Sequence, residues 1–126
     1  MGRWHTRGQL IVYASERLSL AMAESLVHLK RSDNLEPFVR WEIEVPDNLI
    51  TLVPALPAGW ERDQRITRAF GDPWLLAKAS VAMLVPSALV PLEQNCLLNP
   101  AHPQFDLGWV TTGPVPFVFD PRLVAR

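Results

Sequence analysis

The chain has few of the features that define several common protein classes. It has one cysteine, Cys96, so no intrachain disulfide can form, and its three histidines show no zinc-ligand spacing. A net charge of −1 and a pI of about 6.3 argue against a general nucleic-acid binder, since such proteins are usually basic. The sequence contains neither a Walker-type loop nor a Gly-x-Gly-x-x-Gly motif. It also contains no apolar run long enough to span a membrane and no signal-peptide core. We therefore expect a cytoplasmic protein without a metal.

What the chain does contain is the composition of a globular domain. Its 126 residues, 48% of them hydrophobic and 20% charged, fit one compact domain over residues 1–126. Most of the twelve prolines fall in the second half, where they disfavour long helices. We find no internal repeat, low-complexity tract or linker.

The first half predicts one helix between two strands. Residues 9–14, "QLIVYA", are typical of a strand, and residues 15–30 predict a helix with Ser15 as its N-cap. Apolar residues at 3.6-residue spacing predict the core face of this helix, and a second apolar strip lies beside it. The core face comprises Leu18, Ala21, Met22, Leu26 and Leu29, and the strip comprises Leu20, Ala23 and Val27.

The rest of the chain predicts mostly short strands. In residues 38–46, Val39, Trp41, Ile43 and Val45 alternate with charged residues, which indicates a strand with one buried face. Residues 48–54, "NLITLVP", extend or follow this strand. Residues 56–80 predict one or two short helices, with a stop near Gly71 and a restart near Pro73. Further strands are predicted on both sides of a proline turn within 81–91, at 95–100 and at 116–120. This order predicts an α+β fold.

Three stretches combine polar side chains with an unusual context, and each has a structural alternative. Glu24 is either a helix-edge carboxylate paired with Arg17 or His28, or the charge of a binding cleft. Arg3 and Arg7, in "GRWHTRG", belong either to a charged tail or to a phosphate or carboxylate site.

Ser87, between two apolar segments, either satisfies a turn after Pro86 or hydrogen-bonds a ligand. On pattern alone, the structural interpretation is favoured at all of these positions.

Taken in order, three segments resemble the RES-domain family, which is named for an Arg, a Glu and a Ser. They are "GRWHTRGQLIVYASERLSLAMAESLVH", "RITRAFGDPWLLAKASVAMLVPSALVPLEQNCLLNPAHPQF" and "PFVFDPRL". The resemblance implies a fold similar to that of ADP-ribosyltransferase toxins. It places the family's three residues on Arg3, Glu24 and Ser87, and an aromatic residue near nicotinamide on Tyr13. Family members usually carry a further strand before "GRW", so we expect that first strand to be missing upstream of residue 1.

The resemblance implies a bacterial toxin of a type II toxin–antitoxin system. Such a toxin degrades NAD⁺, its substrate rather than a cofactor, by hydrolysis or phosphorolysis of the nicotinamide–ribose bond. Glu24 would stabilise the developing positive charge, Arg3 and Arg7 would bind the pyrophosphate, and Tyr13 would stack on nicotinamide. The implied partners are an Xre-family antitoxin and a second copy within that complex, without direct contact to nucleic acid or membrane. Two alternatives stay open: a catalytically weak antitoxin-binding module, and an ADP-ribosyltransferase that modifies a protein.

Overall fold

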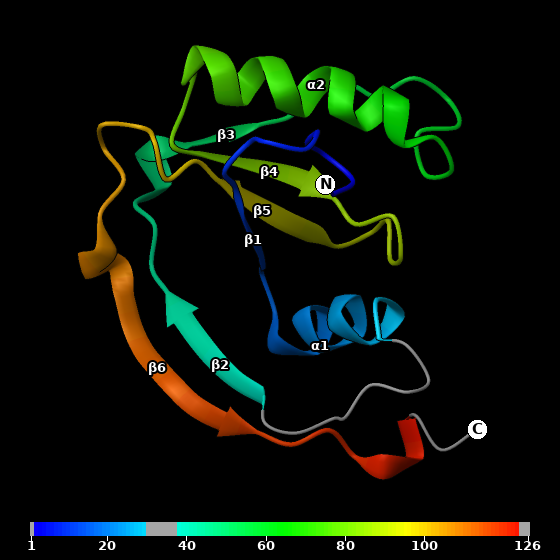
Figure 1. Cartoon of the computed structure of the whole chain (residues 1–126), viewed down its shortest axis with the longest axis vertical. Coiled ribbons are helices and arrows are strands. Elements are labelled where there is room, and N and C mark those ends of the chain that lie inside the picture. Colours follow the sequence, from blue (N-terminus) through cyan, green and yellow to red (C-terminus); the bar gives the residue numbers. More distant parts are fainter. Residues whose placement is uncertain (1, 30–37, 124–126) are drawn as a thin grey trace.

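The computed structural model describes residues 2–29 and 38–123, which form two helices and two β-sheets (Figure 1). The predicted α+β class is confirmed. The strands are β1 (Val12–Ser15), β2 (Phe38–Ile43), β3 (Ile50–Leu52), β4 (Ala82–Pro86), β5 (Gln94–Leu98) and β6 (Val110–Phe117). The α-helices are α1 (Leu18–Val27) and α2 (Gln64–Ala77), and short 3₁₀ turns cover Asp47–Leu49, Leu107–Trp109 and Pro121–Leu123.

The central sheet has the strand order β1-β5-β4-β3. Strand β5 is antiparallel to both of its neighbours, while β3 and β4 are parallel. In Figure 1, α2 lies above this sheet and α1 below it. The main core lies between α2 and the sheet. Its buried members are Trp4, Trp74, Leu75, Met83, Val85 and Leu97.

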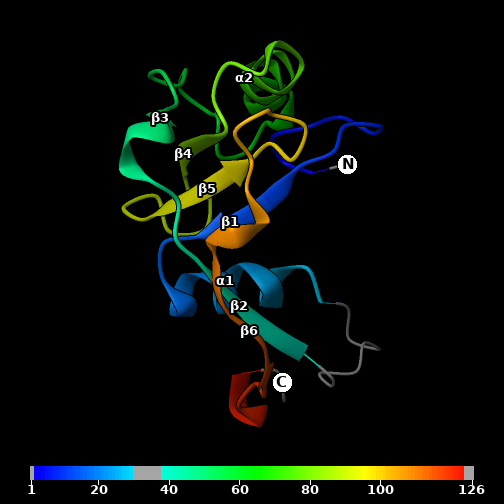
Figure 2. The same cartoon turned by 90° about the vertical axis from the view of Figure 1, so that its left-hand side faces the viewer.

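The second sheet is a two-stranded antiparallel ribbon of β2 and β6 that curves away from the central sheet (Figures 1 and 2). A smaller core of Val81, Ala82 and Leu98 lies where the ribbon joins the body, with Trp109 packed against it. Val39 and Trp41 are 50% and 56% exposed, so the predicted burial is wrong for these two, whereas Ile43 and Val45 of the same predicted face pack against the smaller core. A two-stranded ribbon offers no second layer to cover that face.

The largest correction concerns α2, which is a single helix of 14 residues that runs through Gly71 and Pro73, rather than one or two short helices with a stop and restart there. Its N-cap is Asp63, whose side chain accepts a hydrogen bond from the Arg65 backbone NH at 3.0 Å. Pro73 lies inside the helix, where it lacks an NH to donate. The helix continues past Pro73 because the next two residues, Trp74 and Leu75, are anchored in the main core.

Other boundaries also differ from prediction. Ser15 belongs to β1 instead of capping α1, whose N-cap is Arg17 without a side-chain bond. Residues 87–91 form a turn rather than a strand. The last strand, β6, begins six residues before the predicted start at 116. Residue 30, the predicted end of the first helix, lies outside the described residues.

The buried side of α1 also differs from the prediction. Leu18, assigned to the core face, is 52% exposed, whereas Leu20 of the second strip is only 2% exposed. Residues one turn apart share a face, so the face that buries Leu20 also carries Glu24. Within the described ranges, no helix is both long and apolar enough to cross a membrane.

Candidate active site

Glu24 and Ser87, 63 residues apart in the sequence, are in direct contact. The Ser87 hydroxyl donates a hydrogen bond to Glu24 Oε2 at 2.9 Å. Glu24 lies on α1, and Ser87 follows the last residue of β4. The alternative partners of Glu24, Arg17 and His28, are both exposed. The structure therefore turns the carboxylate toward the strand ends.

The Ser87 side chain is fully buried, at 0% exposure, and all of its hydrogen-bonding capacity is used. Its oxygen accepts bonds from the backbone NH groups of Leu89 and Val90, at 3.1 and 3.0 Å. A hydroxyl has one proton, and here that proton goes to Glu24. The turn role and the contact with the carboxylate are thus both present in one residue.

Asn95 is a member of this cluster that sequence reasoning missed. Its side-chain NH₂ donates to Glu24 Oε2, and its Oδ1 accepts from the Ser15 hydroxyl at 2.6 Å. Ser15 and Asn95 are directly opposite each other in the β1–β5 pairing. A polar residue opening the apolar run "NCLLNP" was the available signal. We call Ser15, Glu24, Ser87 and Asn95 the Glu24 network.

Tyr13 lies on β1, two residues before Ser15 and therefore on the same side of the strand. Its hydroxyl accepts from the Trp4 backbone NH at 3.1 Å and lies 2.6 Å from His5 Nδ1. Burial raises the pKa of Tyr13 and lowers that of His5. A neutral His5 can accept a hydrogen bond from the Tyr13 hydroxyl at Nδ1, which gives both the hydroxyl proton and the ring nitrogen a partner. Tyr13 is still 42% exposed, so its ring is open to a ligand.

Arg3 and Arg7 stand apart from the Glu24 network. The Arg3 guanidinium donates to the Glu61 carbonyl at 3.1 Å, in the loop before α2, and Arg7 is exposed. No hydrogen bond within residues 2–29 and 38–123 joins either arginine to Glu24. Burial raises the pKa of Tyr13, and the charges of Arg68 and, more weakly, Arg3 oppose this shift.

The segment that carries Arg3 is fixed to one face of α2. Its backbone bonds to three side chains of that helix: the Gly2 carbonyl to Arg68 Nε at 2.8 Å, the Arg3 carbonyl to the Thr67 hydroxyl, and the Thr6 NH to Asp72 at 2.9 Å. Trp4, between them, is buried at 2% exposure. Figure 2 shows this segment beneath α2, beside the central sheet. The helix thus places both Arg3 and the groups around Tyr13.

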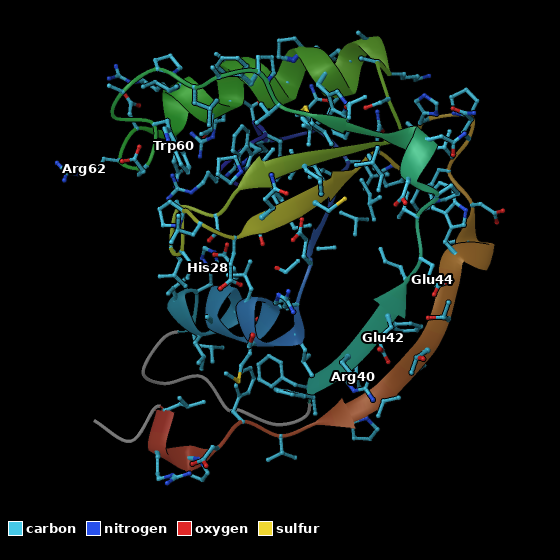
Figure 3. All side chains as sticks on the ribbon, turned by 180° about the vertical axis from the view of Figure 1, so that it is seen from behind. His28, Arg40, Glu42, Glu44, Trp60 and Arg62 are labelled. Atoms are coloured by element: carbon cyan, nitrogen blue, oxygen red, sulfur yellow. The ribbon has the colours of Figure 1, made fainter. Side chains whose placement is uncertain are left out.

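An open hollow of about 430 Å³ lies next to the network without including it. Its lining includes Trp60 of the loop before α2, together with Leu84, Pro86 and Gln94. Pro86 and Gln94 adjoin Ser87 and Asn95 in sequence, and alternation along a strand turns the Gln94 side chain away from that of Asn95. Figure 3 shows Trp60 and Arg62 on this loop, with Arg62 extended away from the body.

Comparisons with known proteins agree with the resemblance found in the sequence. The RES domain profile matches residues 1–120. A protein from Yersinia enterocolitica named "Toxin Res" is 41% identical over 126 residues, covering 97% of this chain and 83% of the relative. A "Prs ADP-ribosylating toxin" from a Sphingobium species is 38% identical over 99% of this chain and 81% of its own length. A "Toxin Res" from Photorhabdus laumondii is 35% identical, with 98% and 81% covered. The chain belongs to the RES-domain family.

Proposed function

We propose that this chain is an enzymatic RES-type toxin that cleaves the bond between nicotinamide and ribose in NAD⁺. The observation that carries the proposal is the Glu24 carboxylate, which receives two side-chain hydrogen bonds on one oxygen, Oε2. The donors Ser87 and Asn95 lie at the ends of two paired strands, so they fix the carboxylate before a substrate binds. Electrostatic groups that need no reorganisation during the reaction are the effective ones in catalysis.

The chemistry suits this residue. Nicotinamide carries a positive ring and leaves as a neutral molecule with the bonding electron pair, so the ribose becomes oxocarbenium-like, as in glycoside hydrolysis. A fixed carboxylate beside the ribose stabilises that positive charge and accepts hydrogen bonds from the ribose hydroxyls. Glu24 takes this role, and Ser87 supports it through its hydrogen bond.

The remaining site residues have binding roles in this proposal. Tyr13, with its partly exposed ring, stacks on nicotinamide. Arg3 and Arg7 neutralise the pyrophosphate, and the anchoring of residues 2–6 on α2 orients Arg3 for this contact.

The group that accepts the ADP-ribosyl unit is water, phosphate or a protein side chain. Water gives ADP-ribose and phosphate gives a phosphorylated ADP-ribose. A second candidate function, transfer to a protein, is favoured by the name "ADP-ribosylating toxin" of the Sphingobium relative. In either case we propose a cytoplasmic type II toxin that is held by an Xre-family antitoxin and forms a homodimer within that complex.

Nicotinamide release from NAD⁺, with and without phosphate, tests the proposal. We expect Glu24→Gln, which keeps an oxygen acceptor for Ser87 but loses the charge, to lower the rate by about 100- to 1000-fold. Glu16→Ala is the matched control, since Glu16 is an exposed carboxylate just before the same helix. Equal rates in wild type and Glu24→Gln would remove Glu24 from the mechanism. No release by the wild type, with or without a protein acceptor, would contradict NAD⁺ cleavage and leave the antitoxin-binding module as the interpretation.

A further inference from the structure

Asn95 occupies an interior position of the central sheet where a large polar side chain needs an explanation. Strand β5 lies between β1 and β4, and Asn95 is opposite Ser15 on one side and Val85 on the other. Both ends of its amide are bonded, the oxygen to Ser15 and the nitrogen to Glu24. The side chain therefore acts as a bridge from β1 to α1.

The bridge has a defined direction. A carboxylate such as that of Glu24 can only accept hydrogen bonds, whereas the Ser15 hydroxyl, which donates to Asn95 Oδ1, can donate or accept. The nitrogen end is then the one presented to the carboxylate. If the amide were reversed, its oxygen would face Glu24 Oε2 and two acceptors would meet. The carboxylate thus selects this amide orientation, and Ser15 anchors the oxygen end.

The two donors on Glu24 converge on the same atom. Ser87 and Asn95 both bond to Oε2, and no hydrogen bond within the described parts of the chain goes to Oε1. A glutamate has three side-chain torsions, and two anchors on neighbouring strands restrict them together. Oε1 is consequently the acceptor left for a ligand.

We infer that Asn95, anchored by Ser15, is a positioning residue that holds the Glu24 carboxylate with Oε1 free for the ribose of the substrate. The inference rests on the proposed function for its ligand, and on the hydrogen bonds of the Glu24 network for its geometry. Asn95 acts through Glu24 and does not itself touch the reacting atoms.

A double-mutant cycle tests this inference. Asn95→Ala in the otherwise wild-type protein should lower kcat/KM for nicotinamide release on the order of 100-fold, the cost of misplacing a catalytic group by about 1 Å. In the Glu24→Gln background the same substitution should cause no further loss, because the group that it positions is already inactive. A further 100-fold loss in that background would overturn the inference, since Asn95 would then act by another route.

Asn99→Ala is the matched control. Asn99 follows β5, is buried at 1% exposure and bonds to the Leu75 carbonyl at 3.1 Å rather than to Glu24. It should lower thermal stability without changing kcat/KM of the folded protein. If Asn95→Ala does not fold, Ser15→Ala replaces it. This variant keeps the Asn95–Glu24 contact but removes the anchor of the amide oxygen, so we expect a loss of roughly 10-fold that again disappears in the Glu24→Gln background.

A structural measurement separates this inference from the proposed function. The ¹³C signal of the Glu24 carboxyl carbon, followed by NMR, should shift in Asn95→Ala or Ser15→Ala and stay in place in Asn99→Ala. An unshifted signal in both network variants would overturn the positioning role. If the wild type releases no nicotinamide, the proposed function fails, while this NMR comparison still decides whether Asn95 positions Glu24.

Discussion

Replacing Gly71 by alanine changes the stability of the protein, and the sign of that change shows whether helix propensity or a clash with the Trp4 backbone dominates. Gly71 is a buried position inside α2, where glycine is a weak helix former, so alanine alone should stabilise the helix by about 1 kcal/mol. The structure predicts the opposite. A Cβ at this position would lie 1.8 Å from the backbone oxygen of Trp4, a separation that no van der Waals contact allows. Backbone cannot rotate away as a side chain can, so the segment 2–6 must leave the helix.

The magnitude follows from what that segment contributes. Trp4 is 2% exposed in the main core, and losing a buried tryptophan costs about 3–5 kcal/mol. Subtracting the gain of about 1 kcal/mol in helix propensity leaves a net destabilisation of about 2–4 kcal/mol. The bonds from Thr67, Arg68 and Asp72 to the segment are lost at the same time.

Urea-induced unfolding followed by far-UV circular dichroism measures this difference. Ala69→Gly is the control, because Ala69 is an exposed position of the same helix and should lose only about 1 kcal/mol. A Gly71→Ala variant more stable than wild type would refute the close approach of Trp4 to α2. The displaced segment also carries Arg3 and the bonding partners of Tyr13, so under the proposed function the variant should bind NAD⁺ more weakly.

Two further predictions concern single titratable groups. Tyr13 is the only tyrosine, so tyrosinate absorbance reports its ionisation directly. Because burial raises the pKa of Tyr13, this group should titrate above pH 10 in the folded protein. The stability that the neutral Tyr13 contributes should then be lost as the pH rises beyond that value. A midpoint in the folded protein equal to that in urea would contradict the burial of this hydroxyl. Burial raises the pKa of the Cys96 thiol to about 11 from an ordinary value of 9.0, so alkylation near pH 8 should be roughly 100-fold slower in the folded than in the unfolded protein. Equal alkylation rates would show that the thiol is accessible.

The sequence predicted the elements better than their limits. The apolar runs around Val12, Phe38 and Met83 all form strands, because a run of β-branched and aromatic residues is a local property. The local sequence does not predict that α2 continues through Pro73. It depends on Trp74 and Leu75 reaching the core beneath the helix, and tertiary packing overrides propensity in such cases.

The exposed faces were mispredicted for a related reason. Alternation in residues 38–46 indicates which residues share a face, but not whether another layer covers that face. Trp41 is exposed because β2 pairs only with β6. On α1, the sequence showed two apolar strips, either of which could face the core. The strip that contains Leu20 is the one that is buried.

The candidate site shows where a reading of single residues reaches its limit. Pattern alone favoured a surface role for Glu24 and a turn role for Ser87, and the weak signal at Asn95, a polar residue before an apolar run, did not connect it with either. These residues lie on three separate elements and meet only when β5 pairs with β1 and β4, so no local signal joins them. The resemblance to a family drew attention to Glu24 and Ser87, while Asn95 emerged from the hydrogen bonds.

Ser87 also shows that a structural and a functional interpretation of one residue need not exclude each other. Its oxygen holds the turn that ends β4 by accepting from Leu89 and Val90, and its proton holds Glu24. Because two backbone NH groups fix the oxygen, the hydroxyl can point its proton in only one direction. The turn is therefore what makes Ser87 a reliable donor to the carboxylate, and a serine on a freely moving loop would lose that constraint.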